Sequence, residues 1–538
     1  MALTPERYLR LVRLRTLRNR RSELDDYLDV ARQRRRMYPR AALVGALSGL
    51  LASVFRMLLT GAGNALDALL VWSHAHDGLL RLAPVATMAA TAALAVWLVR
   101  RFAPEAAGSG IPNLKAVLLR LRPMRAMRLL AVKLVGGVLA IGGGLVLGRE
   151  GPTVQMGGAV GDEVARRMGS PPRERLTLTA AGAGAGLAAA FNAPLSGLVF
   201  VLEEVQRDFR PIVFGAAFVA AAAANVVSRF LSGPFPVFTV PSYPPPPLEA
   251  LPFFVVVGVL AGLFGAVYNR SLLRVSGWFG KAKHPVGLAA LVGAVVGAVA
   301  LFAPLAVGNG HRLAEEVLLG QVALAAVPLW LMGRFALTLA SYGTGAPGGI
   351  FAPLLVLGAL IGLAVGLVAQ QIAPGLVPQP GVYAVVGMGA LFTAIVRAPL
   401  TGIVLILEMT GNYGQMLPLL VSGFFAFGVA EGLGAAPIYE SLLERDLGKG
   451  ALSEGLREPT ILELDVQPHA PFAGKTVAEL GLPPGVILLR ITDGARTFVP
   501  TASTRLDPFV RITAVVAPGS EAGADQLYRG CGIAPPAS

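Results

Sequence analysis

A single acidic residue stands among glycines at the end of a long apolar run. The string GREGPTVQMGG begins at Gly148 and places Glu150 directly after Arg149. The run that precedes it, from Leu129 to Leu147, is apolar except for Lys133. An ionised carboxylate is costly to bury without a partner, so an acid in such surroundings indicates a functional site.

Three strings that are punctuated by glycine and proline share one design: GSGIP at 108–112, GREGP at 148–152 and GIFAP at 349–353. In each, a glycine-permissive turn precedes a proline that suits the first turn of a helix. A helix N-terminus leaves backbone N–H groups unpaired and carries a partial positive charge. Three converging N-termini would therefore hold an anion, yet weakly enough to release it. The alternative is that the strings are ordinary helix starts.

The elements that must position these strings are those of a membrane protein. Of the 538 residues, 54% are hydrophobic and 14% are charged, and the mean hydropathy is +0.64. Many apolar runs approach the ~20 residues of a bilayer span, and their internal glycines and prolines predict broken or half-spanning helices. The apolar runs lie at roughly 41–60, 84–100, 128–147, 176–202, 211–231, 251–270, 286–306, 321–341, 350–373, 382–407 and 416–436.

Two internal repeats organise the apolar region. APLSGLVFVLE, which ends at Glu203, aligns with APLTGIVLILE, which ends at Glu408, and GREGP aligns with GIFAP. A repeated membrane unit predicts a transporter-like architecture with its site where the halves meet. The alignment leaves open whether the repeats are parallel or inverted. We interpret both repeat-related glutamates as structural acids that cap or pair within the fold.

Charge and composition divide the chain further. The formal net charge is +14, and residues 1–40 hold 12 arginines against 5 acids. This favours a basic cytoplasmic helix beside anionic headgroups over a nucleic-acid-binding segment. Short β-like runs such as VILLRI and RITAVVA predict a small cytoplasmic α/β domain near the C-terminus. The expected parts are the helix at 1–40, repeat 1 at 41–232, a Pro-rich linker at 233–250, repeat 2 at 251–447 and the α/β domain at 460–530.

The sequence favours neither an enzyme nor a metal or cofactor site. Cys531 is the single cysteine, which excludes an intrachain disulfide. The pair His74-x-His76 lies at the end of a span without an acidic or cysteine cluster nearby. GAGAG at 182–186 lacks the strand context of a dinucleotide loop, so we predict close helix packing there.

Taken in order, GSGIP, GREGP, AAAFNAPLSGLVFVLEE and GIFAP resemble the CLC family of chloride channels and proton-coupled chloride antiporters. The resemblance continues through APLTGIVLILEMTGNY to GAAPIYESLL and covers roughly residues 40–445. It implies an all-α polytopic membrane protein with a CLC-type inverted-repeat fold of tilted and half-spanning helices. It also implies a homodimer in which each subunit has its own pore.

The resemblance implies a role for each matching residue. Glu150 would be the gating glutamate, which competes with chloride as a carboxylate and swings away when protonated. Glu204 would be the inner proton-transfer glutamate, although it is alternatively an interface acid held by Arg207 or Arg210. Lys133 would give electrostatic support. The implied chloride ligands are the hydroxyls of Ser109 and Tyr439 and the amides of Ile350 and Phe351, with an outer site formed by amides around Arg149, Gly151, Phe351 and Ala352.

The leading interpretation is an H⁺/Cl⁻ exchange transporter in the cell inner (plasma) membrane, multi-pass, with both termini cytoplasmic. Ser109 favours chloride, because family members that prefer nitrate or fluoride commonly depart from serine there. A gated chloride channel of the same fold is the alternative, since an inner glutamate does not by itself decide coupling. An anion-binding membrane sensor is a remote third reading, because no output domain is recognisable.

The tail carries a second resemblance. FAGKTVAELGL and the residues up to 517 resemble the C-terminal half of RCK regulatory domains, which serve bacterial potassium channels and transporters. A Gly-Asp pair common before the last strand of those domains is replaced here by Phe509-Val510. The resemblance implies dimerisation and the binding of a small regulatory ligand such as a nucleotide or cyclic dinucleotide. A dimerisation or stability module without a ligand is the alternative.

Overall fold

The computed structural model describes residues 5–233, 237–238, 240–241, 243–448, 460–493, 496–517 and 520–533, and side chains from residue 34 onward except Glu521. The chain divides into two compact units, Met1–Leu443 and Glu444–Ser538. Each unit has a hydrophobic core of its own, so each is a folding unit with separate packing.

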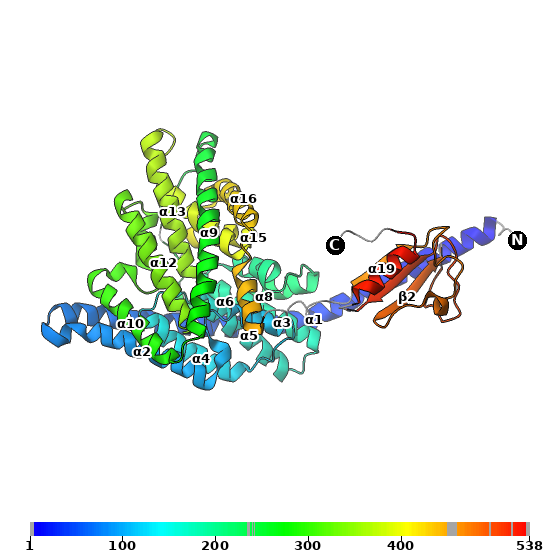
Figure 1. Cartoon of the computed structure of the whole chain (residues 1–538), viewed down its shortest axis with the longest axis horizontal. Coiled ribbons are helices and arrows are strands. Elements are labelled where there is room, and N and C mark those ends of the chain that lie inside the picture. The colour runs from blue at the N-terminus through cyan, green and yellow to red at the C-terminus, as the bar shows by residue number, and fades with distance from the viewer. Residues whose placement is uncertain are drawn as a thin grey trace. The chain divides into compact units, whose positions relative to one another are not determined.

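The first unit is a helical assembly (Figure 1). Eight helical segments of the described chain are long and apolar enough to cross a bilayer, which confirms the predicted polytopic character. The α-helices are α1 (Pro5–His74), α2 (Ala83–Phe102), α3 (Ile111–Leu118), α4 (Ala126–Gly137), α5 (Glu150–Arg167), α6 (Pro172–Phe191), α7 (Pro194–Phe200), α8 (Pro211–Ser232), α9 (Leu251–Gly280), α10 (Pro285–Phe302), α11 (His311–Leu318), α12 (Val327–Gly343), α13 (Phe351–Ile372), α14 (Gly381–Val396), α15 (Pro399–Thr410), α16 (Met416–Gly432) and α17 (Ile438–Leu447).

Short 3₁₀ and π turns join these helices. The π-helical turns η3 (Val138–Gly142) and η4 (Val201–Val205) extend α4 and α7. The second of them carries Glu204, and π turns inside helices often mark functional positions. The 3₁₀ turns are η1 (Gly78–Leu82), η2 (Pro104–Ala106), η5 (Leu248–Ala250), η6 (Pro304–Ala306), η7 (Leu324–Ala326) and η8 (Tyr413–Gln415).

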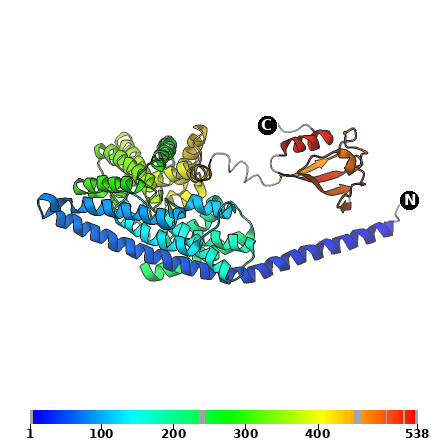
Figure 2. The ribbon, with the colours of Figure 1, turned by 60° about the horizontal axis from the view of Figure 1, so that its bottom comes forward.

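The first helix is longer than the sequence predicts. The apolar run ends near residue 60, but α1 continues to His74 and also extends back through Pro39. Its part from Arg34 to His74 forms one candidate span of 41 residues. Figure 2 shows this part lying beside α2. The residues after 60 continue the helix because no proline interrupts them before the chain turns near Gly78.

The predicted broken helices are present and are repeat-related. The run at 176–202 divides between α6 and α7, and the run at 382–407 divides between α14 and α15. At each break a residue in the left-handed region ends the first helix: Asn192 has a φ of 55° and Arg397 a φ of 68°. Pro194 and Pro399 then open the next helix, where a missing N–H costs nothing. Each break therefore starts a second, shorter helix, α7 in the first repeat and α15 in the second.

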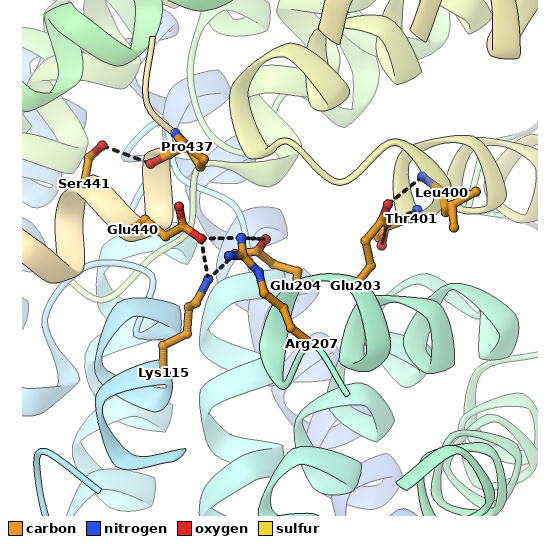
Figure 3. A network of polar contacts seen from close by, with 9 residues as sticks. All are labelled: Lys115, Glu203, Glu204, Arg207, Leu400, Thr401, Pro437, Glu440 and Ser441. Atoms are coloured by element: carbon orange, nitrogen blue, oxygen red, sulfur yellow. Dashed lines mark hydrogen bonds and ion pairs between the residues drawn. The ribbon is translucent and has the colours of Figure 1, made fainter. Parts of the chain in front are cut away.

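Two repeat-related acids cap helices across the repeats. The Glu203 carboxylate accepts three hydrogen bonds of 2.7–3.0 Å from residues 400–401 at the start of α15 (Figure 3). The Glu408 carboxylate accepts three of 2.6–3.1 Å from residues 195–196 at the start of α7. A carboxylate at a helix N-terminus satisfies free N–H groups and the helix dipole. The structure confirms both acids as caps, and their reciprocal exchange relates the repeats by a pseudo-two-fold axis.

Glycines let the helices of each repeat cross backbone to backbone. An added Cβ at Gly157 of α5 would lie 2.1 Å from the carbonyl oxygen of Gly182 in α6. The second repeat has the same crossing, where a Cβ at Gly358 of α13 would lie 2.4 Å from the carbonyl oxygen of Gly387 in α14. Small residues permit this approach in membrane helices. The GAGAG string is thus a packing surface, as the sequence predicts.

The second unit is a small sheet with one helix against it. The strands are β1 (Thr460–Asp465), β2 (Val486–Asp493), β3 (Arg496–Phe498) and β4 (Arg511–Val516), in the order β1-β4-β2-β3. Every pairing is antiparallel. A 3₁₀ turn, η9 (Val477–Leu480), and α19 (Glu521–Gly530) complete the unit. Both predicted strands are present, since VILLRI lies in β2 and RITAVVA contains the whole of β4.

Candidate anion and proton site

The three punctuated strings meet in space. Gly148 and Gly349 exchange two backbone hydrogen bonds of 2.7 Å each, so GREGP pairs with GIFAP through repeat-equivalent residues. The N–H of Gly348 donates to the carbonyl of Gly108 at 3.0 Å, which attaches the loop of GSGIP. The loop also touches the start of α5, because a Cβ at Gly151 would lie 2.8 Å from the Cβ of Ser109. Folding therefore brings three helix N-termini together, although GIFAP follows GREGP by 201 residues in the sequence.

The Glu150 side chain lies at the junction of the paired N-termini. It is 2% exposed, and one carboxylate oxygen has no hydrogen-bond partner among the described residues. A Cβ added at Gly148 would lie 2.2 Å from this oxygen and 3.0 Å from the backbone N of Ala352. The carboxylate therefore sits over the glycine turn and beside an amide of the facing helix, where an anion would be held.

Two hydroxyls and an aromatic ring lie beside these N-termini. Ser109 is 1% exposed, and its Oγ accepts a 3.4 Å hydrogen bond from the N–H of Ile111, which leaves its proton free to donate. Tyr439 is fully buried, and its hydroxyl has no partner among the described residues. The Tyr439 ring stacks on Phe351 with centroids 6.2 Å apart. Buried hydroxyls normally find a partner, so the Tyr439 hydroxyl has a donor available to a ligand.

Two buried cations hold the loops that open the short helices. Lys133 donates from Nζ to the carbonyls of Ala106 at 2.9 Å and Gly108 at 2.7 Å. In the second repeat, Arg334 donates to the carbonyls of residues 306–308 at 3.1–3.2 Å. Both side chains are fully buried. Their hydrogen bonds within the described chain go to backbone carbonyls, so the first role visible for Lys133 is to hold the loop that carries Ser109.

A cavity leads toward Glu150 from one side. Its outer part has a volume of about 240 Å³ and is lined among others by Arg149, Asn309 and His311. The same residues line a smaller hollow of about 30 Å³ whose wall includes Glu150 and Ala352. The Arg149 side chain also donates to the carbonyl of Ala190 at 3.2 Å. A cationic wall on this approach would attract anions to the helix N-termini.

A second acid, Glu204, lies in a buried cluster of charges (Figure 3). It is 1% exposed, and its Oε1 accepts a 2.7 Å hydrogen bond from Nζ of Lys115. Arg207 is more distant at 3.8 Å. Arg210 instead forms an ion pair with Asp208. The alternative prediction, that an arginine holds Glu204, therefore includes a minor partner, Arg207, and misses the main one, Lys115.

The structure thus brings together most of the residues that the sequence singles out. Ser109, Glu150, Gly151, Phe351 and Ala352 surround the paired loops, with Ile350 buried at the cap position of α13. Sequence reasoning missed Lys115 and Arg334. A signal existed for Arg334, which is alone in the apolar run at 321–341 as Lys133 is in its own run. No local pattern announces Lys115 as the partner of Glu204.

Helix N-termini that meet between two repeats, with buried acids and hydroxyls beside them, define an anion-transporting membrane protein. The chain belongs to the CLC family, since residues 90–431 match the voltage gated chloride channel family. The predicted fold class, a CLC-type inverted-repeat membrane domain with a small C-terminal α/β domain, is thereby confirmed, and the protein is a multi-pass membrane transporter.

Relatives support this assignment over most of the chain. The H(+)/Cl(-) exchange transporter ClcA of Vibrio parahaemolyticus is 42% identical over 425 residues, which cover 77% of this chain and 90% of the relative. The protein of the same description from Salmonella paratyphi A is 40% identical, covering 76% and 88%. The crystal structure of a slow cyanobacterial Cl⁻/H⁺ antiporter is 36% identical with a TM-score of 0.74, covering 77% and 99%.

The tail has its own family. Residues 461–526 match the TrkA-C domain, which agrees with the predicted likeness to RCK C-terminal domains. The chain therefore joins a membrane transporter to a TrkA-C domain. No cluster of three or more potential metal-ligating His, Cys, Asp or Glu side chains occurs in the described part of the chain.

Proposed function

We propose that this protein exchanges chloride for protons across the membrane. The observation that carries the proposal is the position of Glu150, whose buried carboxylate lies over Gly148 and beside the amide of Ala352. There it occupies a site built for an anion, and chloride competes with it. Protonation makes the side chain neutral, so it leaves the amides and chloride takes its place. One side chain thereby links the two movements.

Chloride is proposed to occupy two positions along this path. The outer position uses amides around Arg149 and Gly151 together with those of Phe351 and Ala352. The inner position uses the Ser109 and Tyr439 hydroxyls and the amides of Ile350 and Phe351. The free hydroxyl of Tyr439 supports the inner position, because a chloride ion would supply its missing acceptor. Lys133 supports it indirectly by holding the loop of Ser109 and by adding positive potential.

Glu204 is proposed to pass protons between Glu150 and the cytoplasmic side. Its burial, its π-helical position and an Oε2 that accepts no hydrogen bond from the described residues support this role. A buried membrane acid with one oxygen that accepts no hydrogen bond can take up a proton at that oxygen. The exchanger names of the relatives cited above support coupling as well, although a channel of this fold would share the chloride site.

The test is a flux assay with purified protein in liposomes, a chloride gradient and equal pH on both sides. The native protein is expected to move protons against the direction of chloride. Glu150→Gln and Glu150→Ala are expected to abolish proton movement while chloride still passes, since neither side chain can take up and release a proton. Glu204→Gln is expected to lose proton movement too. Chloride flux without opposing proton movement in the native protein would instead favour a channel.

Placement in the cell is part of the proposal. We infer a plasma-membrane protein with both termini in the cytoplasm, since 12 arginines among residues 1–40 favour the inner side. We also infer a homodimer with one pore per subunit, which the family resemblance supports. The mass of the detergent-solubilised protein, measured by light scattering, distinguishes a dimer from a monomer.

The tail is proposed to bind a small regulatory ligand, a nucleotide or cyclic dinucleotide. The likeness to TrkA-C domains supports this proposal. An open hollow of about 480 Å³ beside α19, lined among others by Phe472, Gln526 and Arg529, is one place to probe. Calorimetry of the full-length protein against a nucleotide panel tests the idea, and an absence of heat across the panel would leave dimerisation as the tail's role.

A further inference from the structure

The Glu204 carboxylate is paired with a lysine that the proposed transport mechanism does not use. Lys115 lies on α3, its side chain is 8% exposed, and its Nζ is 2.7 Å from Oε1 of Glu204 (Figure 3). The remaining oxygen, Oε2, is buried and accepts no hydrogen bond from the described residues. One oxygen therefore accepts the hydrogen bond from Lys115. The other lies 3.8 Å from Arg207 without a hydrogen bond and is the position for a proton.

The pair belongs to a cluster of two cations and two carboxylates. Glu440 of α17 lies 3.8 Å from Lys115, and Arg207 contacts Glu440 and lies 3.8 Å from Glu204. These are the charged side chains that face Glu204 within the described chain, and the Tyr439 hydroxyl is the remaining titratable group nearby. With every member ionised the cluster is neutral, so removing any one charge leaves the others unbalanced.

The two cations differ in how strongly they act on Glu204. Lys115 is in hydrogen-bond contact and shielded from water, whereas the Arg207 side chain is 53% exposed and farther away. Attraction between charges falls with distance and is weakened by water and salt. Lys115 is therefore the dominant charge that opposes protonation of Glu204.

The cluster also touches the elements that carry the proposed inner chloride ligands. Lys115 stands one helical turn into α3, which starts directly after the loop of Ser109. Glu440 follows Tyr439 on α17. The lysine thus joins Glu204 to α17, which carries Tyr439, and to α3, whose preceding loop carries Ser109. The charges of Lys115 and Glu204 therefore lie next to the proposed chloride path.

We propose that Lys115 is a positioning residue for the inner proton step. It holds Oε1 of Glu204, leaves Oε2 without a hydrogen bond and available to the proton, and sets the pH at which that proton is taken up. The inference rests on the proposed role of Glu204 and deepens it. Neither the Glu150 gate nor the chloride ligands explain a buried lysine at this position, whereas a tuned proton acceptor does.

The test measures proton flux driven by a chloride gradient in liposomes, at equal pH on both sides, across a series of pH values. Proton movement by the native protein falls as pH rises through a midpoint. Lys115→Gln leaves Glu204 with an unbalanced negative neighbourhood, so protonation persists and the midpoint moves up by about 1 to 3 pH units. Lys115→Arg, which keeps the charge, restores the native midpoint.

Two further variants separate charge from packing. Glu440→Gln removes a negative neighbour, so the midpoint moves down, opposite to Lys115→Gln. Arg207→Gln removes the exposed cation, and its upward shift is smaller than that of Lys115→Gln. A structural role alone would lower the amount of active protein without moving the midpoint in opposite directions. If Lys115→Gln fails to fold, Glu440→Gln still tests the proposal. An unchanged or raised midpoint in Glu440→Gln overturns it.

The outcome is distinguishable from failure of the proposed function. If Glu204→Gln moves protons as the native protein does, Glu204 is not on the proton path and the proposed function fails at that residue. If Glu204→Gln loses proton movement but Lys115→Gln keeps the native midpoint, the proposed function stands and the role of Lys115 is overturned.

Discussion

At the scale of the residue, the proposed chloride site uses amides and hydroxyls in place of a cationic side chain in contact with the ion. Lys133, the buried cation closest in the sequence to GREGP, donates to the carbonyls of Ala106 and Gly108. Its charge thus acts at a distance while its hydrogen bonds fix the loop. Such a site binds an anion without trapping it, which transport requires.

Loss of the Tyr439 hydroxyl is expected to weaken chloride binding. Tyr439→Phe removes one hydrogen bond to a charged ligand, which contributes about 1.5 to 3 kcal/mol, so affinity falls about tenfold or more. Calorimetric titration of the purified protein with chloride measures the change. Tyr383→Phe is the matched control, since that buried hydroxyl is also unpartnered but its residue lines a separate cavity. Equal losses in both variants would argue against a ligand role for Tyr439.

At the scale of the element, each repeat positions its helix N-termini by the same devices. A glycine crossing packs α5 on α6 and α13 on α14, and an acid from one repeat caps a helix of the other. The Gly148–Gly349 pair then joins the two starts that face the ion. Because these contacts are reciprocal, a displacement of one repeat's N-terminus disturbs that of the other.

The glycine crossing is expected to be intolerant of even one methyl group. Gly157→Ala puts a Cβ 2.1 Å from the carbonyl oxygen of Gly182, so the helices must separate. We expect a loss of about 1 to 3 kcal/mol of unfolding free energy, visible as a lower thermal midpoint in detergent. Gly428→Ala in α16 is the control, because its added Cβ meets nothing within 4 Å. A drop of the same size in the control would mean that backbone effects, and not the crossing, determine stability.

At the scale of the whole molecule, the chain joins a membrane unit that holds every proposed transport residue to a separately packed tail. The proposed residues lie between Ser109 and Tyr439, inside the first compact unit. The tail has its own core, which includes Leu464, Ile512 and Leu527. Transport chemistry and the tail's role are therefore separable by deletion.

Truncation after Gly448 is expected to leave coupling intact. All residues proposed to touch chloride or carry protons remain, so the ratio of protons to chloride should match that of the full chain. Liposome flux assays that record chloride and pH with separate electrodes measure the ratio. A changed ratio in the truncated protein would show that the tail acts on the coupling step itself, whereas a changed rate alone would fit regulation.

The tail provides its own reporter of unfolding. Cys531 is the single cysteine and is fully buried, and burial raises the pKa of its thiol to about 12. The thiolate is the reactive form, so very little of the thiol is reactive at pH 8 in the folded tail. We expect a maleimide to label the native protein slowly and the denatured protein rapidly. Rapid labelling of the native protein at pH 8 would contradict the burial of this thiol.

The sequence by itself determined the membrane class, the repeats and the helix breaks, whereas the roles of Ser109, Glu150, Glu204 and Tyr439 came from the family resemblance and stay predictions. It did so because apolar run length, proline position and repeated strings are local properties of the chain. It also predicted the strands of the tail from their alternation and turns.

Only the tertiary structure decided which charges meet. The main partner of Glu204 is Lys115, 89 residues away, while the nearby Arg207 is a more distant partner and Arg210 pairs with Asp208. Arg334 and Lys133 were revealed as equivalent holders of two loops. The extension of α1 to His74, beyond its apolar run, was likewise seen only in the structure. Contacts between distant segments depend on how helices cross, and no spacing within one segment specifies that geometry.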